Sequence, residues 1–246
     1  KGEGVGKREI WLQLKKKNMN LQIFIPAYKE AENLDIILPK IKEAVKGIDH
    51  EIIIIDTMEA MDNTEAVCTK HAVKYFHREG GNTYGDAIRT GFQKAAKEYL
   101  LVMDADGSHS PDDFHKMFED CADYDLTIGS RYVKGGKTDN PAILVFMSQV
   151  VNVCYRIVLG VKVKDVSNSF RVYRTKDVQK LHLDCSNFDL VEEILIKLSI
   201  NNKNYRIREV PTSFKKRMYG ESKRDLVMFA FSYIGSLSKL VKIKAN

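Results

Sequence analysis

The sequence predicts an α/β fold in which a mostly parallel central sheet is covered by helices on both faces. Two observations predict it. Short apolar runs alternate along the first half of the chain with longer segments whose apolar residues recur at helical spacing, an order typical of parallel sheets. The runs themselves are apolar almost throughout, as strands are when both of their faces are buried.

Each element can be placed in order along the chain. The strands are expected at residues 21–25, 51–55, 73–76, 99–103 and 126–128. The first is ended by Pro26, which lacks the backbone donor that a continuing central strand would need. The second contains four consecutive isoleucines, and β-branched residues favour strands. The helices between the strands are expected at residues 30–45, 62–71 and 84–99.

Two later segments, residues 142–159 and 226–240, are predicted to be helices that are apolar around most of their circumference. Their polar residues form narrow stripes, namely Ser148, Asn152 and Arg156 in the first and Ser232, Ser236 and Lys239 in the second. Such a helix is either buried in a core or lies on a membrane. Both are short for a membrane span, and nearby lysines such as Lys242 and Lys244 favour peripheral contact with a membrane surface.

Composition narrows the class of protein and suggests how the chain is divided. The net charge of +6 suits an anionic ligand or an acidic membrane surface, and no nucleic-acid-binding motif accompanies it. The four widely spaced cysteines, Cys68, Cys121, Cys154 and Cys185, predict reduced thiols and no zinc site.

Residues 1–18 are expected to be a segment added for expression or a basic, disordered arm. Residues 19–225 form the main domain, and residues 226–246 a C-terminal amphipathic helix.

The segment Asp104-Ala105-Asp106, directly after the apolar run 99–103, is the strongest functional signal in the chain. Ligands of open α/β sheets bind at the carboxyl ends of strands. Side chains two positions apart in an extended segment point the same way, so both carboxylates can face one site. They are the hard oxygen ligands that Mg²⁺ and Mn²⁺ prefer. An exposed turn at Gly107-Ser108 is the alternative interpretation.

Further motifs stand in a fixed order between residues 20 and 225. They are FIPAYKEAENL at 24–34, GDAIRTGF at 85–92, GSRY with Gly135-Gly136 at 129–136, DVSNSFRVY at 165–173, EVP at 209–211 and RMYGESK at 217–223. Together with the paired aspartates, this set resembles family 2 glycosyltransferases of the GT-A fold, a Rossmann-like fold. Within that family it is similar to the dolichyl-phosphate mannose synthases and other polyprenyl-phosphate glycosyltransferases.

The resemblance implies metal-dependent, inverting transfer of a sugar from a nucleotide-sugar donor, GDP-mannose or a UDP-sugar, to a polyprenyl or dolichyl phosphate. The implied donor-binding residues are Pro26, Ala27, Tyr28, Glu30, Asp56, Asp104, Ala105 and Asp106. Asp104 and Asp106 are the implied ligands of Mg²⁺ or Mn²⁺. Arg131, Arg217 and Lys223 are the implied contacts to phosphate and acceptor, because guanidinium and ammonium groups suit phosphate. Asp106 and Arg131 are the implied catalytic residues.

Some positions depart from the family pattern, and other functions stay open. After Asp56 the usual second aspartate is replaced by Thr57, and the third metal-ligand position falls near Ser108. Glu192 and Glu193 stand near a position where some relatives place an acid by the acceptor, or they are exposed residues of an amphipathic helix. A family 2 transferase acting on a glycan or other soluble acceptor, and a non-catalytic nucleotide-sugar-binding module, are the rival functions. The expected location is the cytoplasm, at the cytoplasmic face of a membrane.

Overall fold

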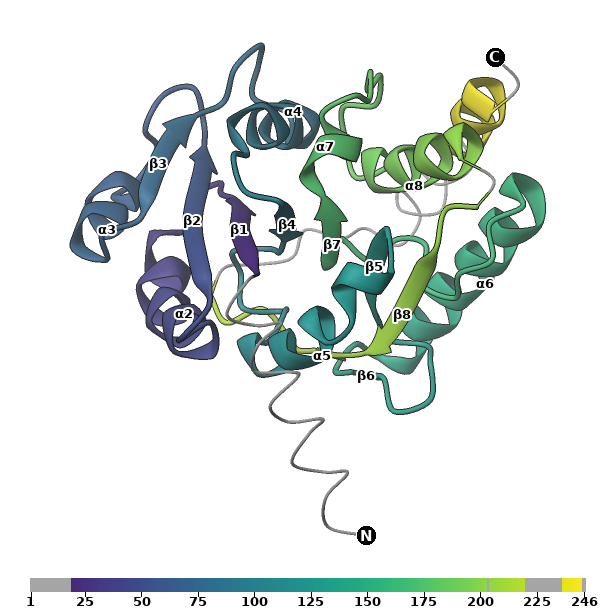
Figure 1. Cartoon of the computed structure of the whole chain (residues 1–246), viewed down its shortest axis with the longest axis horizontal. Coiled ribbons are helices and arrows are strands. Elements are labelled where there is room, and N and C mark those ends of the chain that lie inside the picture. The colour runs from purple at the N-terminus through teal and green to yellow at the C-terminus, as the bar shows by residue number, and fades with distance from the viewer. Residues whose placement is uncertain (1–18, 203, 220–235, 245–246) are drawn as a thin grey trace, which may run out of the picture.

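A seven-stranded sheet in the order β3-β2-β1-β4-β7-β5-β8 forms the centre of the protein. The computed structural model describes residues 19–202, 204–219 and 236–244 (Figure 1). The strands are β1 (Asn20–Pro26), β2 (Asp49–Asp56), β3 (Lys74–His77), β4 (Tyr99–Val102), β5 (Leu126–Ser130), β7 (Arg171–Arg174) and β8 (Ile207–Pro211). β7 runs antiparallel to β4 and β5, and the other neighbouring pairs are parallel. The predicted mostly parallel sheet is confirmed.

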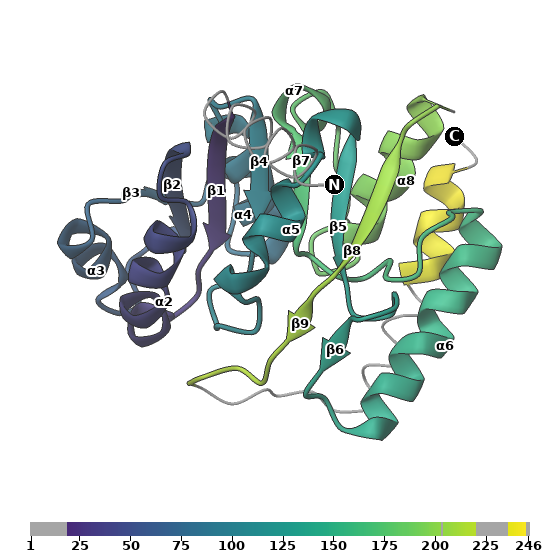
Figure 2. The same ribbon diagram turned by 60° about the horizontal axis from the view of Figure 1, so that its bottom comes forward.

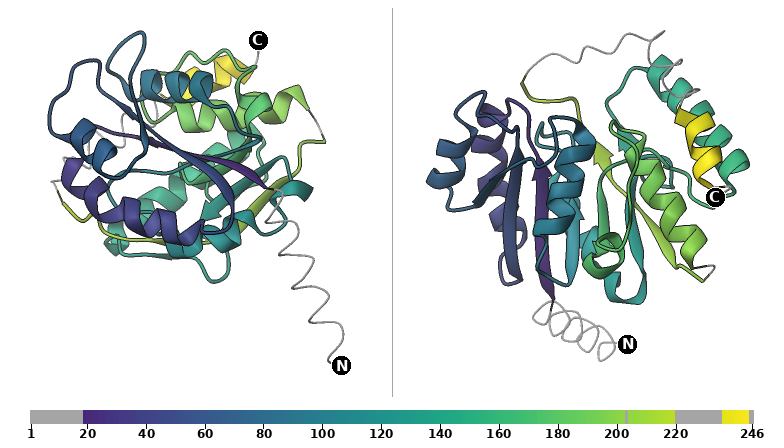
Figure 3. Two further views of the ribbon diagram at one scale, coloured as in Figure 1. Left: turned by 60° about the vertical axis from the view of Figure 1, so that its left-hand side comes forward. Right: turned by 90° about the horizontal axis from the view of Figure 1, so that it is seen from above.

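Helices cover both faces of this sheet, as expected (Figure 3). They are α2 (Ala31–Ala44), α3 (Thr64–Lys70), α4 (Tyr84–Lys94), α5 (Phe114–Phe118), α6 (Ala142–Leu159), α7 (Thr175–Val178) and α8 (Leu190–Asn201), with short 3₁₀ turns η1 (Pro111–Asp113) and η2 (Cys121–Asp123). A small second sheet pairs β6 (Lys137–Thr138) with β9 (Ser213–Phe214). The expected helix 84–99 ends early at Lys94, because the chain needs residues 95–98 to turn back into β4.

The alternation of side chains along β1 shows how one strand serves two cores. Ile23 and Ile25 belong to the core under α2 and α5, whereas Phe24 belongs to the core under α4 and α8. Side chains of a strand point alternately to opposite faces of the sheet. Gly91 of α4 lies directly on the Phe24 ring, where a Cβ atom would come within 2.4 Å of it. Any larger residue would push α4 away from the sheet.

Helix α6 has the predicted bounds, but its two faces are reversed compared with an amphipathic helix on the surface of a water-soluble protein. Part of its polar stripe faces the protein, and apolar residues face outwards. Of its polar stripe, Asn152 is 2% exposed and faces the protein, where its Oδ1 accepts from the Val166 backbone N–H at 2.7 Å. Apolar side chains at helical spacing point outwards, among them Ile143, Phe146, Val150, Val153 and Ile157. The expectation that this segment is too short for a membrane span is wrong for α6: among the described helices, it is long and apolar enough to cross a membrane by length and composition, with 17% of it buried.

The second apolar helix is described only in its last part. Residues 236–244 are helical and lie beside α6 (Figure 2). Leu240 is fully buried in the core that also contains Tyr155 and Leu159 of α6. The rest of the predicted helix 226–240 lies outside the described residues, and so do residues 1–18. The division into a basic arm, a main domain and a C-terminal helix stays a prediction.

Candidate active site

The predicted donor-binding residues meet at one edge of the sheet because β1, β2 and β4 are parallel neighbours that end together. Backbone hydrogen bonds tie the three strand ends: Ala27 N–H donates to Ile55 O at 2.9 Å, and Met103 N–H donates to Phe24 O at 3.1 Å. Ala27 and Ala105 are buried between them. These small buried residues leave room at the edge of the sheet for the longer side chains of their neighbours, such as Asp104 and Asp106.

Asp104 and Asp106 leave β4 at this edge with side chains that are 27% and 22% exposed. Ser169 Oγ donates to Asp104 Oδ1 at 3.0 Å, and the Ser108 backbone N–H donates to Asp106 Oδ1 at 3.0 Å. Gly107, which stands between Asp106 and Ser108, has φ of +78°, a conformation that favours glycine. Both carboxylates are therefore held in place and remain accessible.

The residues at this edge fit a divalent cation. Two carboxylates are a suitable donor set for Mg²⁺ or Mn²⁺, which take oxygen ligands and keep several from water or substrate phosphates. Within the part of the chain that the structure describes, no group of three His, Cys, Asp or Glu residues could hold a metal alone. Ser108 Oγ is buried and has no hydrogen-bond partner among the described residues. Asp104 and Asp106 would therefore share the ion with oxygen atoms of a bound nucleotide-sugar and with water.

A strap of residues 215–219 crosses this site and brings Arg217 into it. The strap is held by its backbone: Lys215 N–H donates to Ser108 O at 2.9 Å, and Met218 N–H donates to Asp106 O at 3.0 Å. Arg217 donates to Glu30 Oε1 at 2.6 Å, and its Nε lies 3.8 Å from Asp106 Oδ2. Three residues predicted from separate motifs thus form one cluster.

The side of the site predicted to bind the nucleotide contains two carboxyl groups whose pKa values are raised. Burial raises the pKa of Glu30 above its ordinary value, and hydrogen bonds from Asn33 and the charge of Arg217 partly offset this shift. Burial likewise raises the pKa of Asp56, whose Oδ2 accepts from Tyr75 OH at 3.1 Å. Pro26 lies at the end of β1, and Tyr28 is 53% exposed. An aromatic ring and two acids therefore border a surface that a nucleoside could occupy.

Asp62, which follows the altered loop after Asp56, has a structural role. Its Oδ2 accepts from the backbone N–H of Ala31 at the start of α2, and its Oδ1 accepts from the N–H of Thr64. Thr57, in place of the usual second acid, is buried and donates to Glu59 O at 2.6 Å. Met58 and Met61 are exposed beside the nucleotide side of the site. The loop therefore has a buried threonine at the position where the family pattern has a second carboxylate.

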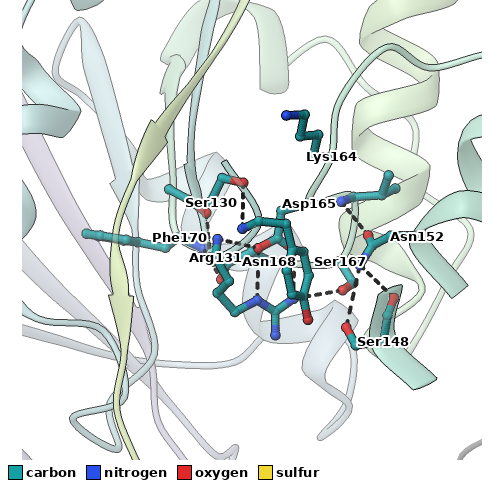
Figure 4. Close-up of polar contacts among 12 residues, drawn as sticks. Ser130, Arg131, Ser148, Asn152, Lys164, Asp165, Ser167, Asn168 and Phe170 are labelled. Carbon is teal, nitrogen blue, oxygen red and sulfur yellow. Dashed lines mark hydrogen bonds and ion pairs between the residues drawn. The ribbon is translucent and has the colours of Figure 1, made fainter. Parts of the chain in front are cut away.

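Arg131 directly follows β5 and is paired with Asp165 (Figure 4). Its guanidinium donates from Nε to Asp165 Oδ2 at 2.8 Å and from Nη2 to Asp165 Oδ1 at 2.6 Å. It also lies 5.4 Å from the centre of the Phe214 ring. This bidentate pair fixes the direction of the guanidinium, so a bound phosphate would share Arg131 with Asp165. Lys223 lies outside the described residues.

The sequence predicts no individual role for Asp165, Asn168 and Ser169, although all three lie in the motif DVSNSFRVY. Their signal was present as DVSNS, but only the fold shows that this segment reaches both Arg131 and Asp104. Of the two interpretations of Glu192 and Glu193, the one that makes them exposed residues of an amphipathic helix is wrong, and a role near the acceptor stays a prediction. Both are buried, because α8 packs its first turn against the sheet.

The two glutamates have different surroundings. Glu193 accepts from the backbone N–H groups of Asp184 and Cys185 and lies 2.8 Å from Lys197. Burial raises the pKa of Glu192 to about 8. Glu193 therefore anchors the loop before α8, and Glu192 is a buried acid that favours its neutral form near pH 7.

An α/β sheet of this order with an Asp-X-Asp pair at its edge is typical of the class of GT-A glycosyltransferases. The model of the family "Glycosyl transferase family 2" matches residues 22–181. The chain therefore belongs to glycosyl transferase family 2, a family of sugar-transferring enzymes.

Three relatives share 30–33% identity with the chain. Dolichol-phosphate mannosyltransferase of Pyrococcus furiosus is 33% identical over 91% of the chain and 64% of its own length. Polyprenol monophosphomannose synthase of Mycolicibacterium smegmatis is 31% identical over 82% and 79%. Undecaprenyl-phosphate mannosyltransferase of Micrococcus luteus is 30% identical over 83% and 87%. The chain thus spans less than two thirds of the archaeal relative.

Solved structures support the fold. Glucosyl-3-phosphoglycerate synthase from Mycobacterium tuberculosis, in complex with Mg²⁺ and UDP, has a TM-score of 0.73 and 14% identity, and the match covers 94% of this chain and 83% of that one. The same enzyme in complex with Mn²⁺ and UDP-glucose also has a TM-score of 0.73 with 14% identity, over 94% and 82%. At this identity the likeness establishes the shared fold alone.

Proposed function

We propose that the protein transfers a sugar from a nucleotide-sugar to the phosphate of a polyprenyl phosphate, with Mg²⁺ or Mn²⁺ bound by Asp104 and Asp106. The cluster of Asp106, Glu30 and Arg217 carries this proposal, because it places a cation between the predicted metal site and the predicted nucleotide site. The names of the three relatives support a mannosyl donor and a polyprenyl phosphate acceptor. The fold neighbours that contain Mg²⁺ or Mn²⁺ with UDP support the cofactor.

The reaction needs charge neutralisation more than proton transfer. An acceptor phosphate oxygen forms a bond to the anomeric carbon while the bond to the nucleoside diphosphate breaks, and the configuration inverts. A phosphate monoester is already anionic near neutral pH and needs no general base, which is consistent with both α8 glutamates being buried. A divalent ion held by Asp104 and Asp106 would neutralise charge on the leaving diphosphate. Arg217 and Arg131 would orient the phosphates of the two substrates.

A donor and acceptor screen tests this function. The protein is incubated with GDP-mannose, UDP-glucose or UDP-N-acetylglucosamine, each with a short-chain polyprenyl phosphate, with Mn²⁺ or with a chelator. We expect labelled mannose in the lipid fraction only when metal is present. Transfer to soluble glycans alone would establish the rival acceptor class, and nucleotide binding without transfer to any acceptor would establish the binding module.

The outward face of α6 supports a membrane-bound acceptor. Phe146 is 63% and Ile157 76% exposed on the same side of the helix, and the exposed lysines Lys162 and Lys164 follow its end. Apolar residues flanked by cations are typical of helices lying in an anionic membrane interface. The inward face is bound to the domain through Asn152 and Tyr155. We therefore propose peripheral contact through α6, at the cytoplasmic face of a membrane.

Charged substitutions on this face are expected to release the protein from lipid. Phe146→Glu and Ile157→Glu should each lower partitioning onto anionic liposomes about tenfold or more, since burying one large apolar side chain contributes roughly 1.5–3 kcal/mol. Flotation at low salt measures this, with circular dichroism to verify folding. The matched control is Ile200→Glu, because Ile200 is 46% exposed on another helix. Equal recovery of all variants would assign α6 to contact with protein instead.

A further inference from the structure

His109 joins the predicted metal loop to the acceptor side of the site through both of its ring nitrogens. It stands three residues after Asp106, and only 2% of its surface is exposed. Its ring lies between the end of β4 and the segment 168–170, which precedes β7. Neither the proposed chemistry nor the family comparison gives this buried side chain a task.

The hydrogen bonds define the tautomer of the ring. The backbone N–H of Asp104 donates to His109 Nδ1 at 3.0 Å, so Nδ1 is the acceptor and carries no proton. Nε2 lies 3.0 Å from Asn168 Oδ1. Since that amide oxygen can only accept, Nε2 carries the proton and donates to it. His109 is therefore a neutral Nε2–H imidazole with both nitrogens engaged.

Aromatic contacts prevent the ring from rotating. It stacks on Phe170 with centroids 4.8 Å apart and planes at 14°, and it meets Phe214 edge to face at 5.5 Å. Phe214 belongs to β9, which leads directly into the strap that carries Arg217. The imidazole is thus fixed between elements from three distant parts of the sequence.

Asn168 extends the link to the acceptor side. Its Nδ2 donates to the carbonyl of Gly129, two residues before Arg131. The neighbouring Ser169 donates to Asp104 Oδ1. A short polar chain therefore runs from the Asp104 backbone through His109 and Asn168 to Gly129, and a second connection from Ser169 holds the Asp104 carboxylate itself.

We propose that His109 is a positioning residue that holds the Asp104 carboxylate in register with the Gly129–Arg131 segment, so that metal-bound donor and acceptor phosphate are correctly placed against each other. The inference rests on the proposed transfer reaction for its kinetic consequence. The tautomer and the effect on metal binding stand independently of which acceptor is used.

Two isosteric variants separate the halves of the link. In His109→Asn the side-chain oxygen can replace Nδ1 as acceptor for Asp104 N–H, while the contact to Asn168 is lost. In His109→Gln the amide nitrogen can replace Nε2 as donor to Asn168, while the acceptor for Asp104 N–H is lost. Asn168→Asp provides an independent variant, because it keeps the acceptor for His109 but removes the donor to Gly129.

His109→Gln should impair metal binding, whereas His109→Asn and Asn168→Asp should impair use of the acceptor. We expect His109→Gln to weaken Mn²⁺ affinity in the presence of GDP about three- to tenfold, as measured by electron paramagnetic resonance of the free ion, with little change in acceptor KM. His109→Asn and Asn168→Asp should raise acceptor KM by a similar factor and leave Mn²⁺ affinity within about twofold. Thermal unfolding verifies that each variant is folded at the assay temperature.

Nitrogen NMR of ¹⁵N-histidine-labelled protein tests the tautomer directly, with His109→Asn identifying the signals. One protonated and one unprotonated ring nitrogen, with the proton coupled to Nε2, is expected, and a proton on Nδ1 would overturn the proposal. The proposal would also be overturned if metal affinity fell and acceptor KM rose together in all three variants, in proportion to their loss of stability, since that indicates a merely structural ring. If the wild-type protein transfers no sugar to lipid, the proposed function fails, while the Mn²⁺ and NMR measurements still decide the role of His109.

Discussion

Asp106→Asn is expected to fold like the wild-type protein and to lose sugar transfer. Asp106 stands past the end of β4 with its side chain partly exposed, and its only described side-chain hydrogen bond, to the N–H of Ser108, can be kept by the amide oxygen of asparagine. The charge is lost, however, and with it the attraction for a divalent cation. Removal of one electrostatic group at a reacting centre costs about 10²–10³ in turnover, and the loss of a metal ligand should reach at least that.

Turnover is measured across a range of Mn²⁺ concentrations, because a weakened metal site shows its defect most clearly when the metal is limiting. Asp112→Asn is the matched control, since it removes the same charge six residues later from a side chain that is 89% exposed. The control should retain wild-type turnover. Wild-type turnover of Asp106→Asn at limiting Mn²⁺ would show that Asp106 is not a metal ligand.

The parallel half of the fold was predictable because its signals are local. The isoleucines of β2 and the apolar run of β4 identify buried strands by themselves, and their polar ends follow at once in Asp56 and Asp104. Parallel neighbours necessarily bring such ends to one edge. The donor side of the site therefore follows from short segments of sequence and a general rule of topology.

The acceptor half was less predictable because it depends on contacts between distant residues. β7 lies between β4 and β5 and runs against both, yet its sequence RVYR looks like an exposed edge. Arg171 is fully buried there, and its guanidinium donates to three backbone carbonyls. A buried arginine is tolerated only when all its donors are paired, and these partners come from residues 166, 168 and 191. No local pattern predicts that set.

The polar stripe of α6 shows the same limit in another form. Periodicity identified the helix and its stripe, but it could not tell which side faces the domain. Asn152 is buried because the backbone N–H of Val166 needs an acceptor there, and this turns the apolar side outwards. Likewise, Arg131 is a plausible phosphate ligand in sequence, and its bidentate pairing with Asp165 becomes visible only in the fold.

Arg217→Ala is expected to lower kcat/KM about ten- to hundredfold. A charged hydrogen bond to phosphate contributes roughly 1.5–3 kcal/mol in the transition state, and the strap already holds Arg217 within 2.6 Å of Glu30 at the site. The strap itself should survive, because its anchors to Ser108 and Asp106 are backbone hydrogen bonds that alanine keeps. Lys216→Ala, which removes the neighbouring exposed cation, is the control and should behave almost as wild type.

Arg217→Ala should also strengthen Mn²⁺ binding while it slows transfer. Measurement of Mn²⁺ binding therefore distinguishes the loss of a phosphate contact from damage to the metal site. The Arg217 guanidinium lies near Asp106 Oδ2 and would compete with a metal ion for that carboxylate. Its removal leaves Glu30 and Asp106 without that cation, so Mn²⁺ alone should bind more tightly while transfer becomes slower. Weaker binding of Mn²⁺ would mean that the mutation damages the metal site. Equal, small effects of Arg217→Ala and Lys216→Ala would mean that the strap is only a solvated basic loop, and the lipid-phosphate acceptor would lose its main local support.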